Sequence, residues 1–124
     1  MKIVYVSGKF TAQNAWEIEQ NNVCTAEDVG MRVAKAGAMP LIPHANTRYF
    51  YGTATPEFLY AGTLELLRRC DAVIMVPGYE SSKGACAELE EAHRLRLPVF
   101  FVVDDRIDGL VSWLRDGAPS YNKE

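Results

Sequence analysis

The sequence predicts an α/β fold in which helices cover both faces of a parallel sheet. Four short apolar runs alternate along the chain with amphipathic stretches of helical period, an order typical of parallel strands joined by crossover helices. The apolar runs are continuous rather than alternating, as expected of strands buried on both faces. The four predicted strands cover residues 3–6, 39–42, 72–76 and 99–103.

Turn and cap residues delimit the predicted helices. The first helix ends at Gly37 and buries a stripe of Ala26, Val29, Val33 and Ala36. The second begins with Thr55 as N-cap, followed by Pro56 at the first helical position. The third helix is expected over 84–96, and a short last helix over about 110–115.

Composition and charge narrow the class of protein. With 124 residues, 48% of them hydrophobic and 23% charged, the chain fits one globular domain over 1–124. The apolar runs are too short to cross a bilayer, and no signal peptide precedes the first strand, so we expect a cytoplasmic protein without membrane contact. The net charge of −3 and the lack of a basic stripe argue against a nucleic-acid polymer as partner. Three cysteines without a paired spacing indicate reduced thiols.

Ligands of such sheets bind beyond the carboxyl ends of the strands, where the strand order reverses. That edge would hold residues 7–10, 43–48, 78–84 and 104–108. Asp71 begins the third strand, at the opposite edge, and we expect it to be structural.

The loop between the third strand and the third helix has the composition of an anion site. Small residues let backbone N–H groups approach a phosphate, and the helix N-terminus and a lysine add positive charge. The simpler alternative, which loop composition alone favours, is a helix N-cap at Ser82 beside a solvated Lys83. The loop residues concerned are Gly78, Ser81, Ser82, Lys83 and Gly84.

Glu88 is the most informative single residue. It shares a helical stripe with Ala85, Ala92 and Leu95 and should therefore face the sheet. A buried glutamate needs a partner or a purpose, and a rim glutamate bonded to a hydroxyl explains the position equally well. A carboxylate held there could attack the anomeric carbon of a nucleoside and form a covalent glycosyl ester. Departure of the base needs a second acid, for which the candidates are Glu17, Glu19, Glu80, Asp104 and Asp105.

Several segments resemble the nucleoside 2-deoxyribosyltransferase superfamily, which includes the 2′-deoxynucleoside 5′-phosphate N-hydrolases. They are IVYVSG at 3–8, PHANTR at 43–48, LLRRCDAV at 66–73 and PGYESSKGACAE at 77–88, and the small phage and bacterial members are most similar. The resemblance runs from Met1 to about Val103. It implies a flavodoxin-like (Rossmann-like) three-layer sandwich with four to five parallel strands. It also implies a homodimer or higher homo-oligomer. We expect no cofactor, and no metal site, because His44 and His93 have no clustered ligand partners in the sequence.

The resemblance also assigns roles to residues. Glu88 matches the nucleophilic glutamate and Tyr5 the tyrosine that orients it. Ser82 matches the serine that binds the 5′-phosphate in the N-hydrolases, where transferases of free nucleosides carry an acidic residue. Thr63 replaces the aspartate that assists the base, and Gly109 stands where relatives place a polar residue that reaches a neighbouring subunit.

Further edge residues have two interpretations. His44, Asn46 and Arg48 could hold a base or phosphate, or could form a hydrogen-bonded turn. Ser7 and Gly8, after the first predicted strand, are also predicted to contact the substrate. Aromatic residues could stack on a base, although a hydrophobic lid or subunit contact explains them somewhat better. These aromatic residues are Trp16, Tyr49, Phe50 and Tyr51.

The predicted function is cleavage of the N-glycosidic bond of a (deoxy)nucleoside 5′-monophosphate or nucleoside through a glycosyl–Glu88 intermediate, by hydrolysis or base transfer. A module that binds and sequesters a nucleotide is the alternative. A phosphoribohydrolase ranks third, because Tyr79 follows Pro77-Gly78 where that class has Pro-Gly-Gly-x-Gly-Thr.

Overall fold

A four-stranded parallel sheet forms the centre of the protein. The computed structural model describes residues 1–10, 22–47, 50 and 52–117. The strands are β1 (Ile3–Ser7), β2 (Met39–Leu41), β3 (Ala72–Met75) and β4 (Val99–Phe101), in the order β2-β1-β3-β4. All three neighbouring pairs are parallel. The predicted α/β fold with a parallel sheet is confirmed, with four strands in the part of the chain described.

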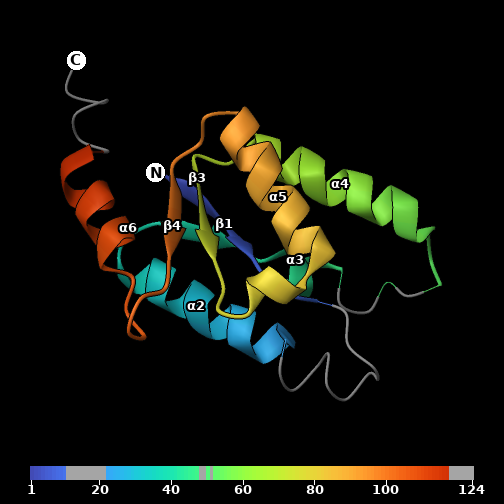
Figure 1. Ribbon diagram of the computed structural model, residues 1–124, viewed down its shortest axis with the longest axis horizontal. Coiled ribbons are helices and arrows are strands. Elements are labelled where there is room, and N and C mark those ends of the chain that lie inside the picture. Colours follow the sequence, from blue (N-terminus) through green and yellow to red (C-terminus); the bar gives the residue numbers. More distant parts are fainter. Residues whose placement is uncertain (11–21, 48–49, 51, 118–124) are drawn as a thin grey trace.

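Helices cover both faces of the sheet and make three layers (Figure 1). The helices α2 (Cys24–Lys35) and α6 (Asp108–Ser112) pack on one face, and α4 (Pro56–Arg68) and α5 (Lys83–Arg94) pack on the other. Three short elements complete the described chain: α3 (Pro43–Asn46) after β2, η2 (Tyr79–Ser81) before α5, and η3 (Trp113–Gly117) after α6.

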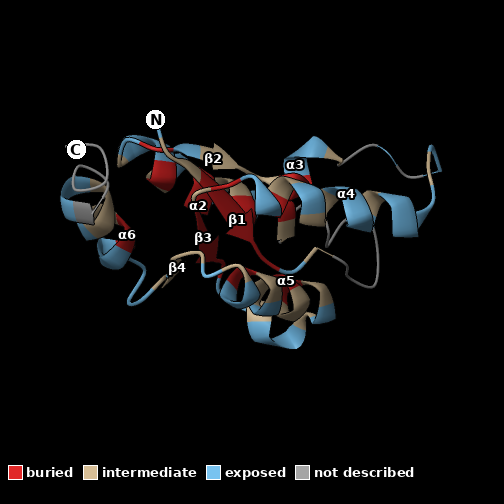
Figure 2. Cartoon of the chain, turned by 90° about the horizontal axis from the view of Figure 1, so that it is seen from above, coloured by how far each residue is buried: buried red, intermediate tan, exposed pale blue. Residues whose placement is uncertain are grey.

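The side chains of β1 alternate between these two layers because successive residues of a strand point to opposite faces. Val4 and Val6 pack with the α2 and α6 layer, whereas Tyr5 packs with the α4 and α5 layer. The buried residues of β1 and β3 form the centre of the molecule in Figure 2. Tyr5 and Ser7, two residues apart, therefore both face α5.

Local signals predicted most boundaries. The Thr55 hydroxyl caps α4 by accepting a hydrogen bond from the Phe58 N–H at 3.1 Å, and Gly37 follows α2 with φ +104°. The Asp71 carboxylate accepts a hydrogen bond from the Ile3 N–H at 2.8 Å at the amino edge of the sheet. Its expected structural role is confirmed.

Some element ends differ from the predicted ones. The second, third and fourth strands stop at Leu41, Met75 and Phe101, short of the apolar runs that predicted them. Val76 is buried just beyond the end of β3, and its N–H still donates a backbone hydrogen bond to the Ser7 carbonyl at 2.7 Å. Pro43 begins a helical turn, as its fixed φ favours.

The described residues contain no helix that is both long and apolar enough to cross a membrane.

Candidate active site

The candidate site lies at the carboxyl edge of the sheet, where the strand order reverses between β1 and β3. β1 contributes Tyr5 and Ser7, and α5, which follows β3, contributes Glu88. Ala85 and Ala92 flank Glu88 in the buried stripe of α5. Because alanine side chains are small, α5 packs close enough for the Glu88 carboxylate to reach β1.

Both oxygens of the Glu88 carboxylate accept a hydrogen bond from a buried hydroxyl. The Tyr5 phenol donates to Oε2 at 2.8 Å, and the Ser7 hydroxyl donates to Oε1 at 2.6 Å. Tyr5 and Ser7 are fully buried, and Glu88 keeps 8% of its surface exposed. The 2.6 Å separation is at the short end of the range for a hydroxyl donor and an oxygen acceptor.

Burial and these hydrogen bonds act on the Glu88 pKa in opposite directions. Burial raises the pKa of Glu88 above its ordinary value, while the hydrogen bonds from Ser7 and Tyr5 lower it and offset part of the rise. Burial, followed by the charge and hydrogen bond of Glu88, strongly raises the pKa of Tyr5. Tyr5 therefore stays protonated and remains a hydrogen-bond donor.

α4 adds two residues beside this pair. The Thr63 side chain counteracts a small part of the rise in the Tyr5 pKa, so Thr63 lies near the phenol. The Thr63 hydroxyl donates to the Tyr60 carbonyl at 2.8 Å. Burial, then the charges of Glu88 and Glu91, raise the pKa of Tyr60, whose side chain is 41% exposed. The Tyr60 phenol is therefore close enough to Glu88 and Glu91 for their charges to act on it.

The loop before α5 combines a helix cap with donor groups. Gly78 has φ +92°, and the Ser81 hydroxyl donates to its carbonyl at 3.0 Å. The Ser82 oxygen caps α5 by accepting from the Ala85 N–H at 3.1 Å, which is the simpler of the two predicted roles. The N–H groups of Lys83 and Gly84 bond to no acceptor within the described residues. The cap uses a lone pair of Ser82, so its hydroxyl hydrogen can still be donated.

His44 joins the segment after β2 to the one after β1. Its Nε2 lies 3.0 Å from the Lys9 carbonyl oxygen and its ring packs on Phe10 at 5.6 Å between centroids. The side chain is 4% exposed, burial lowers its pKa, and its Nδ1 has no partner within the described chain. Its described contacts do not include Glu88. Asn46 is exposed at the end of α3.

Gly8 has a packing role. A Cβ added there would lie 2.7 Å from the Val76 Cβ, so the end of β1 fits beside Val76 only without a side chain.

The described candidates for a second acid have no recorded contact with Glu88. Asp105 pairs with Arg32 at 2.9 Å, and it follows Asp104 in a turn where both have positive φ. Glu80 is exposed on η2. The predictions for Trp16, Glu17, Glu19, Arg48, Tyr49 and Tyr51 concern residues outside the described part of the chain, and Phe50 is exposed.

Comparison with known proteins identifies the family. The model of the family described as a domain of unknown function, DUF4406, matches residues 2–101. The chain belongs to the DUF4406 family. A solved 2-deoxyribosyltransferase from the psychrotolerant bacterium Bacillus psychrosaccharolyticus is similar to this DUF4406 protein with a TM-score of 0.58 and 21% identity, over 88% of this chain and 79% of that one. At this identity the similarity shows the fold. No curated protein matches the chain.

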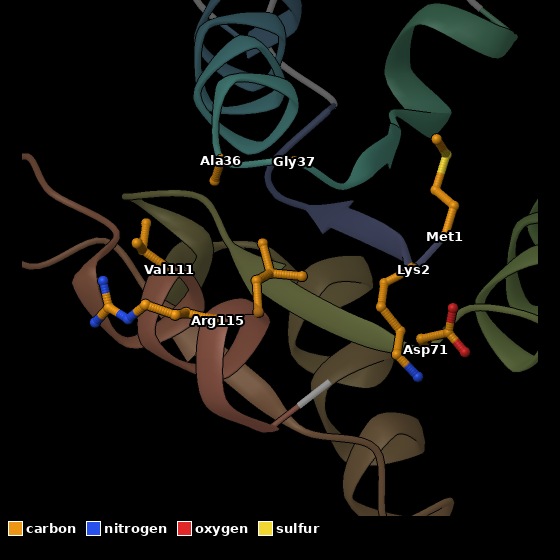
Figure 3. Close-up of a pocket in the computed structure, with 8 residues that line it drawn as sticks. Met1, Lys2, Ala36, Gly37, Asp71, Val111 and Arg115 are labelled. Atoms are coloured by element: carbon orange, nitrogen blue, oxygen red, sulfur yellow. The ribbon is translucent and has the colours of Figure 1, made fainter. Parts of the chain in front are cut away.

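Two described cavities of the DUF4406 protein lie away from Glu88. One of about 650 Å³ lies at the amino edge of the sheet (Figure 3), where Asp71 accepts the Ile3 hydrogen bond. The other, of about 530 Å³, lies beside β4. Glu88 lines neither. The described residues contain no group of three or more His, Cys, Asp or Glu side chains that could hold a metal ion.

The structure brings together Glu88, Tyr5 and Ser7 and adds Tyr60, which sequence reasoning did not assign. Tyr60 was not singled out, although its i, i+3 spacing from Thr63 places both on one face of α4. Ser7 was assigned to the substrate, whereas its recorded side-chain contact is with Glu88. Its two-residue spacing from Tyr5 was the available signal.

Proposed function

We propose that this DUF4406 protein cleaves the N-glycosidic bond of a (deoxy)nucleoside 5′-monophosphate or nucleoside, by hydrolysis or by base transfer. The main support is the position of Glu88. It is a buried carboxylate at the carboxyl edge of the sheet, and each of its two oxygens accepts a hydrogen bond from a hydroxyl. The similar fold of a 2-deoxyribosyltransferase supports the same chemistry.

Glu88 is the nucleophile in this proposal. As the bond between C1′ and the base breaks, its electron pair leaves with the base and C1′ gains positive charge. A Glu88 oxygen forms a bond to C1′, giving a glycosyl ester. Water or a second base then attacks C1′, and the electron pair of the ester bond returns to Glu88. Tyr5 orients the carboxylate throughout.

The surroundings of Glu88 suit this reaction. Few water molecules reach a carboxylate that is 8% exposed, so its attraction for a developing positive charge is only weakly screened. The two hydroxyl donors favour the ionised form that attack requires. Burial alone would leave a larger fraction of Glu88 protonated and unreactive.

The loop before α5 would hold the 5′-phosphate. Ser82 can donate its hydroxyl hydrogen, Lys83 adds a charge, and the N–H groups of Lys83 and Gly84 begin the helix. Six residues separate Ser82 from Glu88, which corresponds to about 9 Å of helical rise. One mononucleotide can span this distance between its phosphate and its sugar.

The test is release of free base from a panel of deoxynucleotides and nucleosides, followed by chromatography. Glu88→Ala should lower the rate by about 10³-fold or more, because no other group in the proposal forms the ester. Glu90→Gln is the matched control, since Glu90 is exposed on the same helix and should leave the rate unchanged. Undiminished turnover in Glu88→Ala would refute the nucleophilic role.

A nucleotide-binding module is the second candidate, and Thr63 favours it. In the resemblance this position holds an aspartate that assists the base, and Thr63 offers a hydroxyl in place of that acid. Tight binding of a nucleotide by calorimetry, with no base released over hours, would support sequestration over catalysis.

A further inference from the structure

We infer that Ser7 positions the Glu88 carboxylate and makes no contact with the substrate. This inference rests on the proposed function, because a positioning role requires Glu88 to react. It reassigns a residue that the sequence had placed among the substrate contacts.

The position of Ser7 is fixed by the sheet. Ser7 is the last residue of β1, lies opposite Met75 of β3, and accepts a backbone hydrogen bond from the Val76 N–H at 2.7 Å. Its side chain is fully buried and its hydroxyl donates to Glu88 at 2.6 Å. A fully buried hydroxyl already bonded in this way has no surface to offer to a ligand.

A second donor matters because the terminal torsion of a glutamate side chain is soft. With Tyr5 alone, only Oε2 of Glu88 would accept a hydrogen bond, and the carboxylate plane could still turn about the line of that hydrogen bond. Ser7 holds the other oxygen, so the two hydroxyls together fix the plane of the carboxylate. The remaining lone pairs then have one orientation toward the sugar, which reduces the entropy lost on reaching the transition state.

The Ser7 hydrogen bond also acts in the second half of the reaction. When water or a base attacks C1′, the Glu88 carboxylate is the leaving group and regains its negative charge. The Ser7 hydroxyl binds the charged Glu88 carboxylate more strongly than it binds the neutral ester. It therefore stabilises the transition state of this step, in which the carboxylate regains its charge. Loss of the donor should slow breakdown of the glycosyl enzyme.

Two variants separate the donor from the volume of the side chain. Ser7→Ala removes the hydroxyl, and Ser7→Cys keeps a similar volume but offers only a weak donor. We expect Ser7→Ala to lower kcat by about 10-fold with KM changed less than about 2-fold, and Ser7→Cys to fall between it and the wild type. The acid limb of the rate profile should move to higher pH in Ser7→Ala, because Glu88 loses a bond that favours its ionised form.

Val6→Ala is the control for a general weakening of β1, because Val6 packs on the opposite face of the same strand. It should lower the melting temperature without moving the acid limb. A raised KM at unchanged kcat and pH profile in Ser7→Ala would instead make Ser7 a substrate contact. An equal shift of the acid limb in Val6→Ala would also overturn the inference.

A readout without turnover separates this inference from the proposed function. The Glu88 carboxyl carbon can be labelled with ¹³C, assigned by its loss in Glu88→Gln, and titrated by NMR. A higher titration midpoint in Ser7→Ala than in the wild type supports the role of the hydrogen bond even if no substrate is cleaved. An unchanged midpoint would refute it whether or not the protein is an enzyme.

Discussion

Glu88 shows how neighbouring side chains act on the ionisation of a buried carboxyl group. Burial disfavours the ionised carboxylate, and two hydroxyls on neighbouring positions of one strand face favour it. Neither Tyr5 nor Ser7 brings a charge of its own. In the proposed mechanism this carboxylate meets the positive charge that develops at C1′.

Ser82 allows the helix cap and the proposed phosphate site to be tested separately. Aspartate caps helices as well as serine does, but its charge would repel a phosphate. Ser82→Asp should keep the melting temperature and lower kcat/KM for the 5′-monophosphate by about 10- to 100-fold, with little change for the nucleoside. Steady-state kinetics on both substrates measure this, and equal losses on both would contradict a phosphate site at Ser82.

Among the three long helices, α4 buries the fewest residues. Leu67 is its one buried residue, and Phe58 near its start is 68% exposed. Its C-terminal end is joined to α5 by Arg68, whose guanidinium bonds the Glu91 carboxylate at 3.1 Å. Arg94 bonds the same carboxylate, and with Arg68 holds the Glu91 pKa to about 2. The intrinsic helix propensity of α4 should therefore influence its stability directly.

Gly62 in the exposed interior of α4 tests this dependence. A Cβ added there has no atom within 4 Å, so Gly62→Ala should raise the free energy of unfolding by about 0.5–1 kcal/mol. Gly8→Ala should lower it by about 1–3 kcal/mol, because the new Cβ overlaps Val76. Urea denaturation of both variants measures the two effects, and destabilisation by Gly62→Ala would count against a solvent-exposed α4.

The whole molecule responds to pH through Glu88 and Glu91 with opposite signs. The raised pKa of Glu88 means that its ionisation costs folding free energy, which is absent below the unfolded value near 4.3 and complete once pH exceeds the folded pKa. The lowered pKa of Glu91 adds stability above about pH 4.3, and this stability is lost as the pH falls toward 2.

The homo-oligomeric state of the protein remains a prediction.

Glu88→Gln isolates the first of these effects, since Glu91 contributes equally to both proteins. The variant should be more stable than the wild type at pH 7, by on the order of 1 kcal/mol, and the difference should vanish near pH 4. Thermal melting across this pH range measures it. A difference independent of pH would mean that the Glu88 pKa is the same in the folded and unfolded states.

Local patterns predicted the elements and the direction of one side chain. Hydrophobic runs located four strands, Thr55 and Gly37 marked helix ends, and the spacing of Ala85, Glu88 and Ala92 placed Glu88 toward the sheet. Each of these features depends on neighbours within a few residues. The predicted strands were longer than the observed ones because apolar residues follow the last paired ones. Val76 is buried and still bonds the Ser7 carbonyl, whereas Val103 is 64% exposed.

The sequence by itself determined the α/β class, the edge that carries the candidate site, and a carboxylate that faces inward from the third predicted helix. Tertiary structure alone decided that the Ser7 hydroxyl meets Glu88 across 81 positions, and that Thr63 of α4 lies near Tyr5. The physical reason is that periodicity specifies the direction of a side chain within its own element. Which atoms it meets depends on strand order, register and the closeness of helix packing.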